Sequence, residues 1–204
     1  MKTVLLHGLG QTEHDWDALI QLASLKEFDS PELFTLSEGK LTYSAILAGL
    51  EKRYDDEKEP LCICGFSLGA MLALDYTIRH KNKVSSLALV GVQYKSPTLL
   101  IDFQNLIFRC MPQKVFEGMD ITKYEMIQLS RSMGSLDFTS GLKDVSCPTA
   151  IICGEKDYAN LKAARRFKEL LPQANLYIIP GVGHEINKTA PDAISAVLGS
   201  LSME

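Results

Sequence analysis

The sequence predicts an α/β fold in which a mostly parallel sheet carries helices on both faces. Short apolar runs alternate with helical patterns along most of the 204 residues, and this alternation favours parallel strands joined through helices. With 46% hydrophobic and 23% charged residues, the composition is typical of a globular chain long enough to bury a good core. Since the chain contains no internal repeat and no low-complexity tract, we expect one domain over residues 1–204.

Short apolar runs bounded by turn residues mark the expected strands. Such runs are typical of strands that are buried on both faces of a parallel sheet. The expected strands are residues 4–6, 33–36, 61–64, 86–90, 150–153 and 176–179. The sheet should therefore contain about six strands.

Helical patterns fill the segments between these runs. Apolar residues recur there at the spacing of one helix face, as Ile46, Leu47 and Leu50 do. The charged stretch 55–60 ends in proline and is expected to be a surface loop. The expected helices cover residues 14–27, 42–53, 68–80, about 159–171 and about 190–201.

Residues 94–141 interrupt the alternation, because they carry helical patterns with no strand between them. Ser96 and Pro97 are expected to start one helix, as its N-cap and first residue. Thr122 and Glu125 fit a capping box that would start a second helix. We interpret the segment as a small helical cap inserted between strands.

Composition argues against several classes of function. The net charge of −4 gives no basic footprint for nucleic acid or for an anionic membrane. No apolar run approaches the roughly 20 residues that span a bilayer, and the N-terminal run is too short for a signal peptide. We therefore expect a cytoplasmic protein that acts on a small molecule and binds neither nucleic acid nor a membrane.

The five cysteines are expected to be free. Cys62 and Cys64 lie two apart in an apolar run, where a strand would point both to one face. A disulfide framework does not fit a chain of this size and composition. No spacing of cysteine and histidine resembles a zinc site, so we expect neither a metal nor another cofactor.

Residues 65–69 read Gly-Phe-Ser-Leu-Gly and fit the pattern G-x-S-x-G between an apolar run and a helical pattern. A tight strand-to-helix turn of this kind exposes the serine hydroxyl at the strand end. The helix that follows offers backbone N–H groups to a developing oxyanion. A plain glycine-rich turn would also fit the five residues alone, but their context favours Ser67 as a nucleophile.

His184 is the best candidate for the base that a nucleophilic serine needs. It follows the expected strand 176–179 through a glycine-rich loop that can carry it over the sheet edge. His14 and His80 lie in polar helix ends and are weaker candidates, and His7 is interpreted as a brace of its loop. With an imidazole as base, activity should fall as the pH drops below about 6.5.

A carboxylate should orient the imidazole of the base. Asp157 follows the expected strand 150–153, at the strand end where ligands bind in open parallel sheets. Glu155 is its rival, and either residue would also fit as a helix N-cap. The order Ser67, Asp157, His184 is expected for such a triad on an α/β sheet.

An oxyanion hole requires two backbone N–H donors near the serine. Leu68 should provide one donor, because it directly follows the nucleophile. The loop at 7–10, after the first strand, should provide the other. Leu9 is the preferred donor there, and Gly10 and Gln11 are its alternatives.

With these motifs the chain resembles the α/β-hydrolase superfamily, in its small, single-domain, esterase-like branch. The shared motifs extend over nearly the whole chain, in the order of the family. They are His7-Gly8-Leu9-Gly10 with Trp16 downstream, Gly65-Phe66-Ser67-Leu68-Gly69, Cys147-Pro148 before a strand ending Gly154-Glu155-Lys156-Asp157, and Gly181-Val182-Gly183-His184.

The resemblance implies that Ser67 is the nucleophile and His184 the general base. It also favours Asp157 over its rival as the acid, and the backbone N–H groups of Leu9 and Leu68 as oxyanion donors. The family inserts its cap where the helical segment 94–141 falls.

The resemblance also bears on the sheet. The family's usual fold starts with two extra antiparallel strands, but here the first expected strand begins almost at Met1. The truncation leaves a sheet edge that longer relatives cover, and a second copy of the chain could shield it as a homodimer.

The leading hypothesis is a serine hydrolase that cleaves a small carboxylic ester or thioester through an acyl-enzyme on Ser67. Apolar side chains of the cap would line an adaptable pocket if some face the serine, or they would simply pack the cap onto the domain. They are Met111, Met119, Met126, Met133, Phe103, Phe108, Phe116, Tyr124 and Phe138.

Two other hypotheses stay open. The resemblance includes lyases and carbon–carbon hydrolases of the menaquinone-pathway type, which keep the fold but change the reaction. A ligand-binding protein that kept the fold without catalysis is the third hypothesis, although it would need neither Asp157 nor His184.

Overall fold

An open parallel sheet forms the centre of the computed structural model, which describes all residues except 24–26, 97–104, 106–107, 113, 115–120 and 202–204. Within the described residues its strands are β1 (Thr3–Leu6), β2 (Phe28–Asp29), β3 (Leu61–Phe66), β4 (Val84–Val90), β5 (Thr149–Gly154) and β6 (Asn175–Ile179). They lie in the order β2-β1-β3-β4-β5-β6, and all neighbours pair in parallel. The predicted α/β fold, with a mostly parallel sheet of about six strands, is confirmed.

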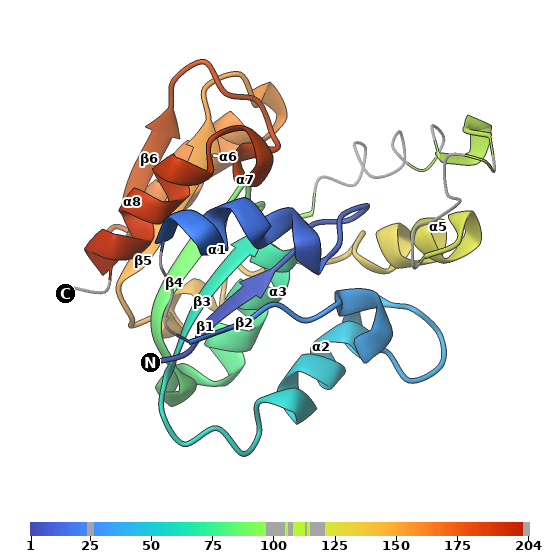
Figure 1. The fold of residues 1–204 in the computed structure, drawn as a ribbon, viewed down its shortest axis with the longest axis horizontal. Coiled ribbons are helices and arrows are strands. Elements are labelled where there is room, and N and C mark those ends of the chain that lie inside the picture. The colour runs from blue at the N-terminus through green and yellow to red at the C-terminus, as the bar shows by residue number, and fades with distance from the viewer. Residues whose placement is uncertain (24–26, 97–104, 106–107, 113, 115–120, 202–204) are drawn as a thin grey trace.

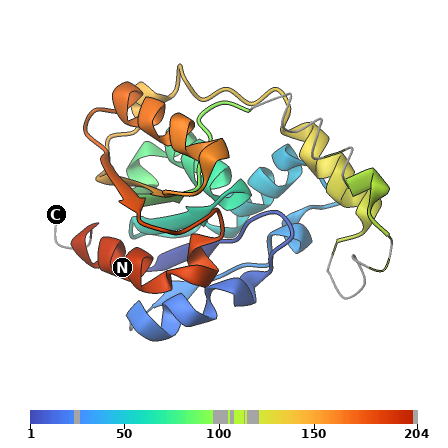
Figure 2. The same cartoon turned by 90° about the horizontal axis from the view of Figure 1, so that it is seen from above.

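Helices cover both faces of this sheet (Figures 1 and 2). One face packs against α1 (Asp17–Ala23) and α8 (Pro191–Leu201), which also contact each other. The other face packs against α2 (Tyr43–Arg53), α3 (Leu68–Arg79) and α6 (Tyr158–Leu170). Shorter helices are η1 (Glu13–Trp16), η2 (Leu33–Leu36), η3 (Lys81–Lys83), η5 (Leu142–Asp144) and α7 (Ile186–Thr189).

Strand β3 shows how the sequence supplies both layers of the core. Leu61 and Ile63 belong to the cluster under α2 and α3, whereas Cys62 and Cys64 belong to the cluster under α1 and α8. Alternate side chains of a strand point to opposite faces, so an unbroken apolar run serves two layers at once. The prediction that Cys62 and Cys64 are buried on one face is confirmed, and both thiols are free.

The predicted strand at 33–36 is wrong, because these residues form the 3-10 helix η2. The second strand is instead the two-residue β2, upstream of it. The Glu32 carboxylate accepts a hydrogen bond from Phe34 N at 3.1 Å, and His7 Nε2 accepts one from Leu33 N at 3.0 Å. These side-chain acceptors satisfy amides that a strand would have paired with a neighbour, and so they stabilise a turn.

The predicted helices agree better with the structure. The patterns at 42–53, 68–80, 159–171 and 190–201 correspond to α2, α3, α6 and α8 within two residues at each end. The pattern at 14–27 is divided into η1 and α1 as far as Ala23, and residues 24–26 of it lie outside the described residues.

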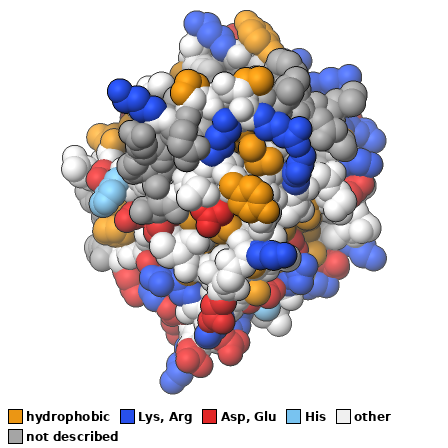
Figure 3. Space-filling view, turned by 90° about the vertical axis from the view of Figure 1, so that its right-hand side faces the viewer, with side chains coloured by type: hydrophobic (Ala, Val, Ile, Leu, Met, Phe, Trp, Pro, Cys, Tyr) orange, Lys and Arg blue, Asp and Glu red, His pale blue; other side chains and the backbone are white. Residues whose placement is uncertain are grey.

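The segment 94–141 contains one fully described helix, α5 (Lys123–Ser132). Its predicted capping box is present: Glu125 N donates to Thr122 Oγ1 at 3.2 Å, and Thr122 N donates to the Glu125 carboxylate at 2.9 Å. Most of the first expected helix, from Pro97 on, lies outside the described residues. Figure 3 faces the side that carries α5, where Lys and Arg side chains lie around exposed hydrophobic ones.

No helix in the described part of the chain is long and apolar enough to cross a membrane.

Candidate active site

Ser67 occupies a strained turn between β3 and α3. Its φ of 51° makes it the one non-glycine residue with a positive φ among the residues that the structure describes. Such backbone strain costs about 1–3 kcal/mol and concentrates at functional sites. A Cβ on Gly65 would collide with the carbonyl of Gly69, and a Cβ on Gly69 would collide with that of Leu6. The two glycines of the motif are therefore required by the tightness of the turn.

Three predicted site residues come together at the carboxyl ends of the strands. His184 Nε2 lies 3.2 Å from Ser67 Oγ, and His184 Nδ1 lies 2.6 Å from Asp157 Oδ2. Ser67 follows β3, Asp157 follows β5 and His184 follows β6. The hydroxyl, imidazole and carboxylate thus form one continuous line of hydrogen bonds.

The imidazole of His184 is held by its neighbours as well as by its hydrogen bonds. The ring of Phe66 lies 4.8 Å away between centroids. On another side the backbone of Gly91 is so close that a Cβ there would lie 2.9 Å from His184 Cε1. These contacts limit how far the ring can turn away from Ser67.

Asp157 is buried, and besides His184 it contacts Asn160, a residue that the sequence did not reveal as part of the site. The Asn160 side-chain amide donates to both carboxylate oxygens of Asp157, at 3.0 and 2.8 Å, and Gln93 Nε2 donates to Asn160 Oδ1 at 2.6 Å. Burial raises the pKa of the Asp157 carboxyl, but hydrogen bonds from His184 and Asn160 outweigh it and hold that pKa below its usual value. Asp157 is therefore ionised at neutral pH.

Asp157 also accepts a hydrogen bond from Asn160 N at 3.3 Å, as the N-cap of α6. The Asp157 carboxylate thus contacts His184 and also caps α6, so both roles considered from the sequence are compatible with the structure. An asparagine three residues after an N-cap aspartate is the only sequence signal that could have indicated Asn160, and it is a weak one.

The rival residues lie elsewhere. Glu155 is exposed and accepts a hydrogen bond from Gly181 N at 2.8 Å, and it forms no hydrogen bond or ion pair with His184. His14 is exposed beside Glu13 and Asp17, and His80 bonds Glu51, and neither forms a hydrogen bond with Ser67. 

The loop after β1 lies beside the N-terminus of α3, because Gly69 packs directly against the carbonyls at the end of β1. Gln11 N donates to Gly8 O at 3.2 Å, so this alternative donor is already engaged. Within the described residues, the backbone N–H groups of Leu9, Gly10 and Leu68 have no acceptor. Leu68 and either Leu9 or Gly10 therefore remain candidates for the two oxyanion donors.

His7 lies buried between this loop and η2. It is fully buried, with Nδ1 at 2.9 Å from Gly8 O and Nε2 accepting from Leu33 N. The ring of Phe34 packs edge-on at 5.1 Å. His7 thus braces the loop after β1 against η2, as its interpretation from sequence proposed.

The apolar residues named as candidate pocket residues in the segment 94–141 differ in burial. Met126, Met133 and Phe138 are buried in the core, and Met126 Cε would lie 3.9 Å from a Cβ on Gly10, which places it beside the loop after β1. Tyr124 is 74% exposed. Phe108 and Met111 pack partly against the core, and Phe103, Phe116 and Met119 lie outside the described residues.

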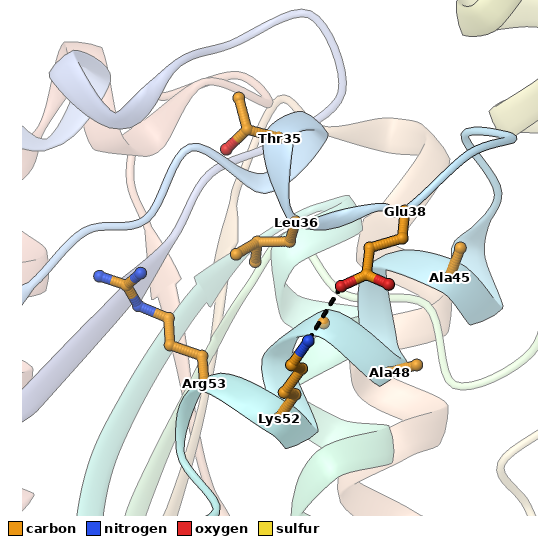
Figure 4. A pocket seen from close by; sticks show the side chains of 8 residues that line it. Thr35, Leu36, Glu38, Ala45, Ala48, Lys52 and Arg53 are labelled. Atoms are coloured by element: carbon orange, nitrogen blue, oxygen red, sulfur yellow. Dashed lines mark hydrogen bonds and ion pairs between the residues drawn. The ribbon is translucent and has the colours of Figure 1, made fainter.

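A hollow of about 570 Å³ lies between η2 and α2 (Figure 4). The ion pair between Lys52 and Glu38, at 2.9 Å, crosses it. Its lining is Thr35, Leu36, Glu38, Ala45, Ala48, Gly49, Lys52 and Arg53. No group of three His, Cys, Asp or Glu side chains in the described ranges could hold a metal ion.

Comparison with known proteins relates this geometry to one family. A family model described as "Alpha/beta hydrolase family" matches residues 3–197. No match is found among curated proteins.

Solved structures match over almost their whole length. An esterase from Exiguobacterium antarcticum has a TM-score of 0.84 at 16% identity, and the match covers 100% of this chain and 92% of that one. MenH from S. aureus has a TM-score of 0.82 at 17% identity, with 98% and 92% covered. The enol-lactonase from Burkholderia xenovorans has a TM-score of 0.80 at 17% identity, with 100% and 91% covered. At these identities the likeness establishes the fold alone.

Proposed function

Because the chain belongs to the alpha/beta hydrolase family, we propose that it is a serine hydrolase that cleaves a small carboxylic ester or thioester. The observation that carries the proposal is the continuous line of hydrogen bonds from Ser67 through His184 to Asp157. The names of two structural neighbours, an esterase and an enol-lactonase, fit ester chemistry and support the same class of reaction.

In the acylation step, Ser67 Oγ attacks the carbonyl carbon of the ester while its proton passes to His184 Nε2. The ionised Asp157 stabilises the imidazolium that forms. The carbonyl oxygen becomes an oxyanion that accepts hydrogen bonds from Leu9 N and Leu68 N, each worth roughly 3 kcal/mol in the transition state. Collapse of the intermediate breaks the bond to the alcohol or thiol, which takes the proton from His184.

In the deacylation step, water replaces the alcohol. His184 removes a proton from the water as its oxygen attacks the acyl carbon, and the same oxyanion donors stabilise the second intermediate. The bond to Ser67 Oγ then breaks, the carboxylic acid leaves, and Ser67 recovers its proton from His184.

The size of the substrate is inferred from what lies beside the loop after β1. Met126 is an unbranched, polarisable side chain that adapts to ligands of different shape, and it lies next to Gly10. An acyl group of modest length and apolar character fits this surrounding best.

A fluorophosphonate probe tests the proposal, since it reacts covalently with an activated serine. We expect one adduct, located at Ser67 by mass spectrometry and absent in Ser67→Ala. In His184→Ala the labelling rate should fall by roughly 10³-fold or more. His80→Ala is a matched control, because His80 bonds Glu51 far from the serine, and it should label at the normal rate.

Turnover of p-nitrophenyl esters of different chain length then distinguishes the competing functions. Hydrolysis of the short esters supports the proposal. Labelling at Ser67 without turnover of any ester would favour a lyase or carbon–carbon hydrolase that uses the same three residues. Absence of both would favour a non-catalytic ligand-binding protein.

A further inference from the structure

Two buried amides connect segments of the chain that flank the site. Gln11, in the loop after β1, is 4% exposed, and Asn187, in α7, is fully buried. Asn187 Nδ2 donates to Gln11 Oε1 at 3.1 Å, and Gln11 Nε2 donates to Asn187 Oδ1 at 3.3 Å. The two side chains therefore exchange a reciprocal pair of hydrogen bonds across 176 residues of sequence.

Backbone groups fix the orientation of both amides. Gln11 Oε1 also accepts from Gly8 N at 3.2 Å, and Asn187 Nδ2 also donates to Asp15 O at 3.3 Å. A backbone N–H can only donate and a backbone carbonyl can only accept, so the oxygen and nitrogen ends of each amide are determined. A buried polar network whose members are all satisfied is rigid.

The ends of this network lie next to two groups of the proposed mechanism. Gly8 directly precedes Leu9, whose N–H is a proposed oxyanion donor. Asn187 lies three residues after His184, and Ile186 N donates to His184 O at 2.8 Å within the same turn. A displacement of the amide pair would therefore change the distance between the oxyanion donor and the imidazole.

We propose that Gln11 and Asn187 are positioning residues, which fix the loop after β1 relative to the loop that carries His184. The inference rests on the proposed function, because it assumes that the distance between the oxyanion donor and the imidazole of His184 matters for catalysis. Catalytic groups lose much of their effect when they are displaced by about 1 Å, and a direct side-chain link between the two loops prevents such a displacement.

Asn187→Leu removes the link and keeps a side chain of similar size. The matched control is Lys188→Met, since Lys188 Nζ joins the same two segments at the surface, at 3.0 Å from both Asp15 and Glu185, without reaching Gly8. The double exchange Gln11→Asn with Asn187→Gln keeps two amides of the same total length and is the rescue variant.

The first measurement compares kcat/KM for a p-nitrophenyl ester with that for its thionoester, in which sulfur replaces the carbonyl oxygen. Sulfur is a weak hydrogen-bond acceptor, so the thionoester benefits little from the oxyanion donors. In Asn187→Leu we expect kcat for the oxygen ester to fall 10- to 100-fold, and the oxygen-to-sulfur ratio of kcat/KM to fall at least fivefold. A general loss of active protein would leave that ratio unchanged.

The second measurement needs no activity. Hydrogen exchange of the Gly8 amide, followed by NMR, should be at least tenfold faster in Asn187→Leu than in the wild type. Lys188→Met should leave both the exchange rate and the ratio within twofold of the wild type, and the double exchange should restore both to within about threefold.

An unchanged ratio with unchanged Gly8 exchange in folded Asn187→Leu overturns the inference. If Asn187→Leu does not fold, the comparison of Gln11→Asn alone with the double exchange decides, and failure of the double exchange to improve on the single variant is the contrary result. A wild type that hydrolyses no ester refutes the proposed function, whereas Gly8 exchange still decides whether the pair holds the loop.

Discussion

At the scale of single residues, the backbone around His184 matters as much as the groups that it bonds. Gly91 has a φ of 62°, and a Cβ there would lie 2.9 Å from His184 Cε1. Gly181 has a similar φ of 72°, but a Cβ there would meet no atom within 4 Å. Substituting each glycine in turn therefore distinguishes the effect of backbone strain from the effect of contact with the imidazole.

We expect Gly181→Ala to lower stability by about 1 kcal/mol, because an L residue is disfavoured at positive φ. Gly91→Ala should lose at least as much, because its Cβ also clashes with His184. Only Gly91→Ala should also displace His184, and its kcat should fall at least tenfold on a p-nitrophenyl ester. Urea unfolding and steady-state kinetics measure the two effects. Equal loss of activity in both variants would mean that strain alone, rather than displacement of the ring, is responsible.

At the scale of elements, helix α5 depends on its N-terminal cap. Thr122 is exposed and buries little surface, so its main contribution comes from its hydroxyl, which accepts a hydrogen bond from Glu125 N and donates one to the Glu125 carboxylate. The first bond satisfies one of the N–H groups that have no partner inside a helix.

We expect Thr122→Ala to lower the free energy of unfolding of α5 by about 1 kcal/mol. Thr122→Ser keeps the hydroxyl and should not lower this free energy, because serine is at least as good an N-cap as threonine. Hydrogen exchange of amides in α5 measures the effect locally, with amides of α3 as the internal reference. If α3 exchanges faster to the same degree, the cap stabilises the whole domain rather than its own helix.

The elements also explain which parts of the molecule the sequence could predict. Ser67, Asp157 and His184 each follow a strand within five residues, so local patterns were enough to place them near the ends of strands. The 3-10 helix at 33–36 depends on His7, which lies 26 residues away from Leu33, and an apolar run of four residues carries no trace of that contact.

The pair of buried amides is an even clearer case of a contact that local sequence patterns do not predict. Gln11 and Asn187 contact each other across 176 residues, and single polar residues in loops or short helices have no periodicity that would link them. Sequence patterns predict the candidate catalytic groups of this sheet, because each follows its own strand. They do not predict the groups that hold those strands' loops together.

At the scale of the whole molecule, the short edge strand β2 is fixed to α2 by a charged cluster. Asp29 accepts hydrogen bonds from Arg53 at 2.9 and 3.0 Å and from the hydroxyl of Tyr54 at 3.0 Å. Burial raises the pKa of the Asp29 carboxyl, but the hydrogen bonds from Arg53 and Tyr54 outweigh it, and the pKa lies below its usual value. The charge of one carboxylate therefore links β2 to the end of α2.

Because the pKa of Asp29 is lower in the folded chain than in the unfolded chain, its contribution to stability is complete above about pH 4 and is lost as the pH falls through the folded value. At pH 7 we expect Asp29→Asn to lower the free energy of unfolding by about 1 kcal/mol, since the pair is only partly exposed. The difference from the wild type should shrink between pH 4 and pH 2, where the wild type loses the same interaction.

Urea unfolding across this range measures the difference in free energy. The control variant Asp56→Asn removes an exposed carboxylate of the loop after α2 and should follow the wild-type curve. A constant difference between wild type and Asp29→Asn down to pH 2 would show that β2 is held by packing and not by this charge.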